Sequence, residues 1–423
     1  MAKSTAYLNS CKARGITLLV KQNTRNTDKV RAPSMATGSS SACRQLKKTK
    51  QTSRSPLSTE DSLLIPHLPQ EIIIEVLSRL PVKSLLRFRC VSKSWRSLIS
   101  QPEFAKTHLR LASTNTDYTL HRLLLCSSLD FKSCSLYSIL NEKSDTAVEL
   151  DCPLKGAYST TWIVGCCYGL VCVAAGNEVS IWNPSTRKSK RLPNVRMANL
   201  YRGAYGFGYD ESSDDYKVVG VFHDVGNSDF EAEVKVYSLK TNSWRRIGGF
   251  PDRLPLTPHG SGTCVSGALH WFSTGDCGKN IVSLDLVKET YGEVSEPDYR
   301  DGILHQVWLD ALNGCLCVLG MYRDFVDVWV MKEYGTRESW TKFVVIPYVS
   351  HPCDNLSRPL LWTLKNGEVV MRTYTHLVRY NPKDGTFNYP VFWYIVYSYV
   401  ESLFSLDIDA ESGIQWQQPQ RQC

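Results

Sequence analysis

The sequence lacks the cysteine spacings of a metal site or a disulfide framework. Its 15 cysteines in 423 residues include no Cys-x-x-Cys pair, and no cluster of His and Cys stands at the spacing of metal ligands. Several cysteines lie instead within strand-like apolar segments, as Cys172 and Cys317 do. We therefore expect buried, reduced thiols, a location in the cytoplasm or the nucleus, and neither a metal nor a cofactor.

Long hydrophobic runs are also missing. A membrane-spanning helix needs roughly 18 to 20 predominantly apolar residues. The best candidates, residues 164–176 and 389–404, are too short or contain Tyr, Ser and Glu. We therefore expect no membrane partner.

Acidic residues are nearly absent from the first 59 residues, where Asp28 stands among twelve lysines and arginines. This segment has a formal charge of +11, whereas residues 60–423, with 37 basic and 40 acidic side chains, carry −3. Nucleic-acid binding needs a basic stripe on a folded surface, and the near-neutral body shows none in its sequence. A nucleic-acid partner is therefore not expected.

The composition of residues 1–60 predicts a disordered basic tail. Lys, Arg, Ser, Thr, Asn and Gln dominate it, and few large apolar residues follow Val20. Three functions compete with a plain solvated tail: an organelle transit peptide, an RNA-contacting arm, and a nuclear signal at Lys47, Lys48 and Lys50. Met35 offers an alternative start, which would make the first 34 residues a gene-model extension. Residues 411–423 are expected to form a flexible C-terminus.

Hydrophobic periodicity predicts a small helical module over residues 64–110. Pro69 suits the first turn of a helix, which Pro81 ends; Val82 begins a second helix and Ser92 can cap a third. The apolar residues of the first helix recur on one face, at Ile72, Ile73, Val76, Leu77 and Leu80. Three short helices bury too little apolar area to be stable alone, and no disulfide or metal supports them. Either the following domain or a partner protein must cover part of this surface.

A repeat of about 45 to 55 residues runs through residues 115–410. Each unit has a hydrophobic strand that follows a glycine, as after Gly169 and Gly314, and then a second strand. The second strands advance through Trp182, Tyr237, Leu284, Trp329 and Tyr380. These steps suit the blades of a kelch-like β-propeller. With a further half-blade at 123–139 and a closing segment at 392–408, we predict six blades, with seven as the alternative.

The segment from Leu68 to Leu109 resembles the F-box of plant F-box proteins along its roughly 40 positions. The resemblance rests on Leu68-Pro69, Leu80-Pro81-Val82, Leu85, Arg89-Cys90-Val91-Ser92-Lys93, Trp95 and Leu98-Ile99. It implies binding to a Skp-family adaptor and, through that adaptor, to a cullin and a RING protein. The residues implied to face the adaptor are Leu68, Pro69, Ile72, Ile73, Leu77, Leu80, Pro81, Leu85 and Val91. For each of them a role in the internal core is the open alternative, because interface cores and domain cores have the same composition.

Residues 160–390 resemble the F-box-associated domain of the same plant proteins. The most specific pieces are Asn183-Pro184-Ser185-Thr186 and the Tyr-Gly-Phe-Gly-Tyr-Asp run at 205–210. The two resemblances imply a small all-α F-box module followed by an all-β kelch-like propeller of about six blades. They also imply a non-catalytic substrate-recognition subunit of an SCF-type (Skp-cullin-F-box) ubiquitin ligase. Loops on one propeller face would bind an unidentified target protein.

Candidates for an active site are few, so no catalytic residue is expected. His259-Gly260-Ser261-Gly262 is a glycine-rich turn without the strand-elbow-helix context of a nucleophile. Asp276 and Cys277 have no recognisable catalytic partner. Carboxylates for acid-base work or cation binding occur at Asp210, Glu211, Asp214 and Asp215, but their position in one turn favours a solvated loop. The alternative function is a propeller-fold hydrolase with a non-functional F-box.

Overall fold

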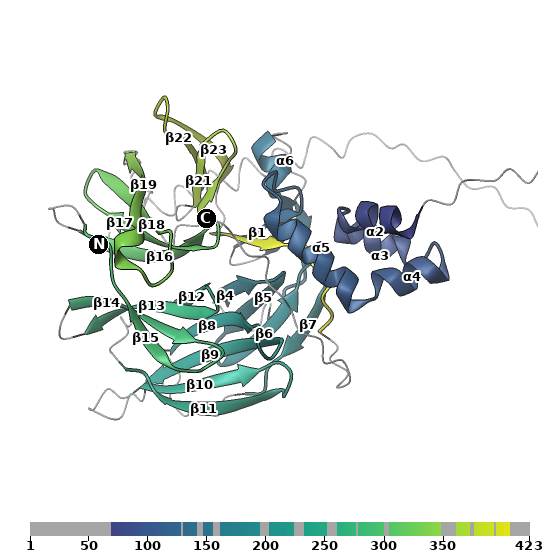
Figure 1. Cartoon of the computed structure of the whole chain (residues 1–423), viewed down its shortest axis with the longest axis horizontal. Coiled ribbons are helices and arrows are strands. Elements are labelled where there is room, and N and C mark those ends of the chain that lie inside the picture. Colours follow the sequence, from purple (N-terminus) through teal and green to yellow (C-terminus); the bar gives the residue numbers. More distant parts are fainter. Residues whose placement is uncertain are drawn as a thin grey trace, which may run out of the picture. The chain divides into compact units, whose positions relative to one another are not determined.

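The computed structural model describes residues 69–127, 130–141, 147–154, 161–194, 203–223, 232–251, 260–275, 278–299, 304–347, 361–372, 376–392 and 395–406. The predicted tail, Leu68 and residues 411–423 lie outside these ranges. Within the ranges, a group of helices comes first and a set of antiparallel sheets follows, as Figure 1 shows. The predicted order of an all-α module and an all-β propeller is confirmed.

Four helices form the first part: α2 (Gln70–Ser78), α3 (Val82–Phe88), α4 (Lys93–Ile99) and α5 (Pro102–Thr114). Ser92 caps α4 as predicted, because its hydroxyl accepts the Trp95 N–H at 3.1 Å. Helix α5 runs for 13 residues and is a fourth helix, beyond the three that the sequence analysis described. It begins at a proline, a residue that suits the first turn, and its buried side chains lie along one face: Phe104, His108, Leu109 and Ala112.

The strands form five sheets within the described ranges, four of them four-stranded. Blade 1 contains, in spatial order, β24 (Ile395–Val400), β1 (His121–Cys126), β2 (Phe131–Ser135) and β3 (Val148–Glu149), with helix α6 (Leu136–Asn141) after β2. Blade 2 contains β4 (Thr161–Cys167), β5 (Leu170–Ala175), β6 (Glu178–Asn183) and β7 (Lys188–Arg191). Blade 5 contains β16 (Gln306–Leu312), β17 (Cys315–Met321), β18 (Phe325–Met331) and β19 (Trp340–Pro347), with the short helix η1 (Arg337–Ser339) before β19. Blade 6 contains β20 (Leu361–Thr363), β21 (Val369–Arg372), β22 (His376–Asn381) and β23 (Thr386–Phe392).

The fifth sheet has eight strands and is two blades joined at their inner edges. Blade 3 contains β8 (Gly203–Asp210), β9 (Asp215–His223), β10 (Ala232–Ser238) and β11 (Ser243–Gly249). Blade 4 contains β12 (Ser261–Val265), β13 (Ala268–Gly275), β14 (Gly278–Asp285) and β15 (Tyr291–Val294). Only two residue pairs, Ser261 with Tyr205 and Gly262 with Gly206, join β12 to β8 in parallel. The described residues therefore form six four-stranded blades, in agreement with the predicted six.

The last strand closes the ring. Strand β24 pairs with β1 from His121↔Val400 to Cys126↔Ile395, so the C-terminal end of the propeller completes the first blade. It also contacts β4, the first strand of blade 2. Blade 1 thus takes its innermost strand from the far end of the propeller, which confirms the predicted closing segment at 392–408.

The glycines that lead the repeated strands have a local cause. Tyr168-Gly169, Ser266-Gly267 and Asn313-Gly314 each place two successive residues in the left-handed region, with φ between 43° and 85°. A two-residue hairpin of type I′ requires positive φ at both positions, and its twist matches that of the flanking strands. The repeat seen in the sequence is therefore the hairpin between the first and second strands of a blade.

Candidate functional site

Helix α2 carries apolar side chains on both its inner and its outer side. Ile73, Leu77 and Leu80, at i, i+4 and i+7, pack into the core of the helical module. Ile72 and Val76, also four residues apart, are 43% and 55% exposed. Apolar side chains on the solvent side of a helix are unusual unless a partner covers them.

The predicted adaptor-facing residues divide into an exposed, a half-buried and a buried group. Pro69, Ile72, Pro81 and Val91 are exposed, and the exposed fraction of Val91 is 63%. Ile73 and Leu80 are half-buried, and Leu77 and Leu85 are 2% and 0% exposed. Leu77 and Leu85 therefore occupy the internal core, which was the open alternative for each residue. Leu68 lies outside the described residues.

Val76 belongs to the exposed group although the sequence analysis did not place it there. It follows Ile72 by one helical turn, and Pro69 precedes Ile72 by three residues, so the three lie on one side of α2. The i, i+4 spacing with Ile72 was the signal in the sequence. It could not be used, because Ile73 and Leu77 have the same spacing and pack toward the core.

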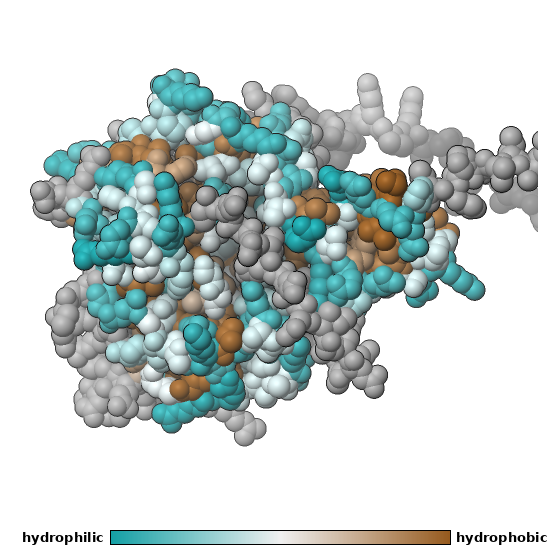
Figure 2. All heavy atoms as spheres, in the orientation of Figure 1, coloured by the Kyte–Doolittle hydropathy of each residue, from teal (hydrophilic) through white to brown (hydrophobic). Residues whose placement is uncertain are grey.

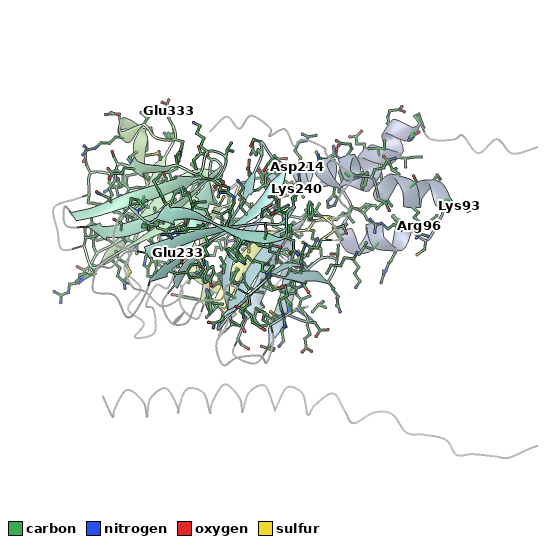
Figure 3. All side chains as sticks on the ribbon, turned by 90° about the horizontal axis from the view of Figure 1, so that it is seen from below. Lys93, Arg96, Asp214, Glu233, Lys240 and Glu333 are labelled. Atoms are coloured by element: carbon green, nitrogen blue, oxygen red, sulfur yellow. The ribbon has the colours of Figure 1, made fainter. Side chains whose placement is uncertain are left out.

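The helices beside this apolar side are basic. Between Glu75 and Glu103 the sequence has no acidic residue, but it has six basic ones, at Arg79, Lys83, Arg87, Arg89, Lys93 and Arg96. All are exposed except Arg89, which is half-buried. Figure 2 shows hydrophobic atoms gathered over the region of α2 and α3, and Figure 3 shows Lys93 and Arg96 projecting from α4. An apolar centre with a polar, charged rim is the anatomy of a protein–protein interface.

The acidic turn between β8 and β9 is not the solvated loop that the sequence predicted. Asp210 and Asp215 are both buried. The carboxylate of Asp210 accepts hydrogen bonds from the amides and hydroxyls of Ser212 and Ser213, and that of Asp215 accepts the amide of Lys240 at 2.9 Å. These donors shape the turn and anchor it to the next hairpin, so the prediction of a solvated loop is wrong for these two residues.

Asp214 of the same turn carries a charge that is poorly stabilised. Burial raises its pKa to about 6, although Lys106 and Lys240 oppose the shift. Figure 3 shows Asp214 and Lys240 close together at the end of the sheets nearest the helices. Asp214 also has φ of 53°, a conformation that asparagine tolerates as well as aspartate does.

We expect Asp214→Asn to raise the melting temperature at pH 7.5 and to leave it nearly unchanged at pH 4. The folded pKa lies above the unfolded value near 3.9, so the wild type loses stability as the pH rises from about 4 through 6. The variant has no such charge, and we expect it to gain at most about 1 kcal/mol at pH 7.5 after solvent screening. Thermal unfolding at several pH values checks this, and an equal gain at both pH values would contradict it.

The residues considered for catalysis do not assemble into a site within the described chain. Ser261 is buried in β12, where its hydroxyl faces the Ile163 carbonyl at 3.5 Å. His259, Asp276 and Cys277 lie outside the described residues. Among the residues that are described, no group of three or more His, Cys, Asp or Glu side chains could hold a metal ion. Nor does any helix in these ranges have the length and apolarity to cross a membrane.

Comparison with known proteins agrees with this architecture. Residues 65–107 match the F-box domain, and residues 122–389 match the F-box associated beta propeller domain. The chain belongs to this family of F-box proteins. The F-box/kelch-repeat protein At3g23880 of Arabidopsis thaliana is 34% identical over 346 residues, which cover 79% of this chain and 93% of that protein. The F-box protein CPR1 of the same plant is 32% identical and covers 72% of this chain and 79% of its own length.

The family match defines a general role. An F-box implies binding to a Skp-family adaptor, and an F-box joined to this propeller supports a substrate-adaptor role in SCF complexes. Among solved structures, a nidogen/laminin complex aligns over 67% of this chain at 7% identity, with a TM-score of 0.40. That likeness is too low to support an argument about function.

The motif Asn183-Pro184-Ser185-Thr186 of the F-box-associated propeller has a structural role. The side-chain oxygen of Asn183 accepts the amides of Ser185 and Thr186, which closes the turn after β6. Its side-chain nitrogen donates to the carbonyls of Ser402 and Phe404 at 3.1 and 2.9 Å. Asn183 is fully buried, so this one side chain ties the blade 2 turn to the segment that follows the closing strand.

Proposed function

We propose that the chain recruits a target protein to an SCF-type ubiquitin ligase and that the adaptor docks on the exposed apolar side of α2. The observation that carries the proposal is the exposure of Ile72 and Val76 on a helix whose opposite side is already packed. Fully burying a Val or Ile side chain is worth roughly 1.5 to 3 kcal/mol, so covering the exposed half of each of these two would contribute about half of that. Val91 and Pro81 supply further exposed apolar surface on the same module.

The buried members of the predicted set act through packing. Leu77 and Leu85 lie in one cluster with Val82, Ile99 and Phe104. They hold α2 and α3 in the orientation that presents the outer side of α2. We therefore propose that substitutions at these two positions weaken adaptor binding by unfolding the module and not by removing a contact.

The target is proposed to bind the propeller face opposite the helices. Helix α5 leads into β1 at His121, which pairs with Val400 at the end of β24. In the other blades the tight hairpin lies at this place, between the end of the first strand and the start of the second. The helices are therefore joined to the propeller face that carries the tight hairpins. The longer connections, such as residues 192–202, 250–260 and 348–360, leave from the other ends of the strands. These connections lie mostly outside the described residues, and which of them contact a target stays a prediction.

The protein is proposed to be a non-catalytic subunit that acts in the cytoplasm or the nucleus. The free thiols of the described chain, Cys126, Cys172 and Cys317 among them, support this location, because disulfides form and persist in oxidising compartments. The thioester chemistry of ubiquitin transfer then belongs to other subunits of the ligase.

The test is reconstitution with purified partners. We expect the full chain to bind a Skp-family adaptor, to retain a cullin–RING pair only when the adaptor is present, and to show no hydrolase activity alone. A folded chain that binds none of a panel of Skp-family adaptors would overturn the proposal. Hydrolysis by the isolated chain would favour the alternative function.

A further inference from the structure

The segment after the closing strand contacts both domains. Residues 401–406, here called the clasp, continue from β24 without helix or strand. The backbone N–H of Glu401 donates to the Leu120 carbonyl at 3.0 Å, which holds the start of the clasp beside the entry to β1. From there, the contacts of successive clasp residues alternate between the helical module and the propeller.

Two clasp residues complete the helical module. The Glu401 carboxylate accepts the Val82 N–H at 2.7 Å, across 319 residues of sequence. Val82 opens α3, and the residue before it, Pro81, makes no side-chain cap, so Glu401 satisfies the first amide of the helix and lies at the positive end of its dipole. Leu403 is buried in the core of the helical module with Leu77, Leu85 and Phe104.

The other clasp residues are held by the propeller. The backbone carbonyls of Ser402 and Phe404 accept hydrogen bonds from the side-chain nitrogen of Asn183. The centroids of the Phe404 and Tyr216 rings are 5.0 Å apart. Leu406 joins the apolar core that fills the space between blades 2 and 3. The fit is close at Gly169, where a Cβ atom would lie 2.2 Å from the Cβ of Ser402.

The helical module needs contacts from outside its own helices to complete its core. The module spans about 45 residues, from Gln70 to Thr114, and has no disulfide within the described chain. This length is below the size at which a hydrophobic core is comfortably stable alone. Part of its cover comes from a segment that directly follows the strand closing the propeller ring. Closure of the ring and cover of the F-box core therefore depend on two adjacent parts of one continuous segment, residues 395–400 and 401–406.

We propose that the clasp couples adaptor binding to closure of the propeller, so that an unclosed or truncated receptor binds the adaptor weakly. This proposal rests on the adaptor role proposed above. Glu401 and Leu403 are then positioning residues. They do not contact the adaptor, but they hold α2 and α3 in the arrangement that binds it. Coupling is reciprocal, so the adaptor must in turn stabilise the clasp.

The first experiment compares three chains by calorimetric titration with the adaptor. A chain that ends at Leu406 keeps the clasp, and we expect it to bind as the full chain does. A chain that ends at Val400 lacks the clasp, and we expect its affinity for the adaptor to fall by about tenfold or more. The reason is that the helical core loses at least one well-packed side chain, and the free energy of that contact corresponds to a change in affinity of this size. Equal affinity of all three chains would overturn the proposal.

Because truncation could open the whole ring, a point variant tests the clasp in the full chain. Leu403→Asp places a charge in the helical core, and Val287→Asp makes the same kind of change at an exposed turn of blade 4. We expect only the first to weaken adaptor binding and to separate unfolding into two transitions. In the wild type, the adaptor should also slow amide hydrogen exchange at residues 401–406.

The outcomes separate the two proposals. Failure of the wild type to bind any adaptor would contradict the proposed function. The unfolding of Leu403→Asp would still test the clasp, because two transitions are expected if the clasp links the helical module to the propeller. Adaptor binding that is unaffected by Leu403→Asp, with unchanged exchange at residues 401–406, would defeat the clasp alone.

Discussion

Replacing Ile72 by lysine is expected to weaken adaptor binding by more than 100-fold while leaving the melting temperature within about 2 °C of wild type. Ile72 is 43% exposed, so the folded chain can accept a charge there, but a buried interface cannot accept an unpaired ammonium group. The expected loss is about 3 kcal/mol or more, which is typical of a central interface residue. Val76→Lys should act in the same way, because Val76 is even more exposed.

Thr116→Lys is the matched control for Ile72→Lys. It adds the same charge at an exposed position in the turn after α5, beyond the four helices. Calorimetric titration of the adaptor into each variant, with circular dichroism to confirm folding, gives the comparison. Unchanged binding by folded Ile72→Lys and Val76→Lys would place the adaptor on another surface.

Replacing Lys217 by methionine is expected to destabilise the propeller by about 3 to 5 kcal/mol, the usual result of breaking a buried ion pair. Lys217 is buried in β9, and its ammonium group lies 2.8 Å from Asp210, 3.0 Å from Glu289 and 2.5 Å from the Leu286 carbonyl. These partners belong to blades 3 and 4. Methionine keeps the length of the side chain but leaves the buried Asp210 carboxylate without this cation, while Glu289 keeps its ion pair with Arg245.

The pH dependence of this variant gives a second measure. In the wild type, burial opposes ionisation of Asp210, but the donors Lys217, Ser213 and Ser212 outweigh it and lower the pKa to about 2. Stability from this group is therefore fully present above about pH 4 and lost as the pH falls through about 2. Without the Lys217 ammonium group the loss should begin at a higher pH.

Urea unfolding at pH 7.5 and at pH 3.5 measures both effects. Lys188→Met, on the outer strand β7, is the control, since an exposed substitution should change stability by about 0.5 kcal/mol or less. A Lys217→Met variant within 1 kcal/mol of wild type at pH 7.5 would show that the buried pairs contribute little net stability.

The acidic turn shows where reasoning from the sequence failed. Four carboxylates within six residues are usually solvated, and nothing near them in the chain indicates otherwise. The groups that bury Asp210 and Asp215 include Lys217, whose other partner Glu289 is 72 residues away, and Ser238 and Lys240 of the next hairpin. These pairings arise only when neighbouring strands and blades come together.

Helix α2 shows a related limit. Its periodicity was correct, and so was the assignment of the segment to an F-box, but two pairs of residues compete at the same spacing. Ile72 with Val76 and Ile73 with Leu77 both satisfy i, i+4, and only the packing against the other helices and Leu403 decides which pair is buried. A helical pattern defines an apolar stripe but not the boundary between its internal and external parts.

By itself, the sequence determined the features that depend on neighbouring residues: the helix starts at Pro69, Val82 and Ser92, the glycine-led strands, and the six repeated blades. Periodicity and turn chemistry act over a few residues, so they can be read directly from the chain. Tertiary structure alone decided that the clasp completes the F-box core, that Glu401 caps α3 across 319 residues, and that the carboxylates of Asp210 and Asp215 are buried. These features depend on contacts between distant segments, which local patterns do not specify.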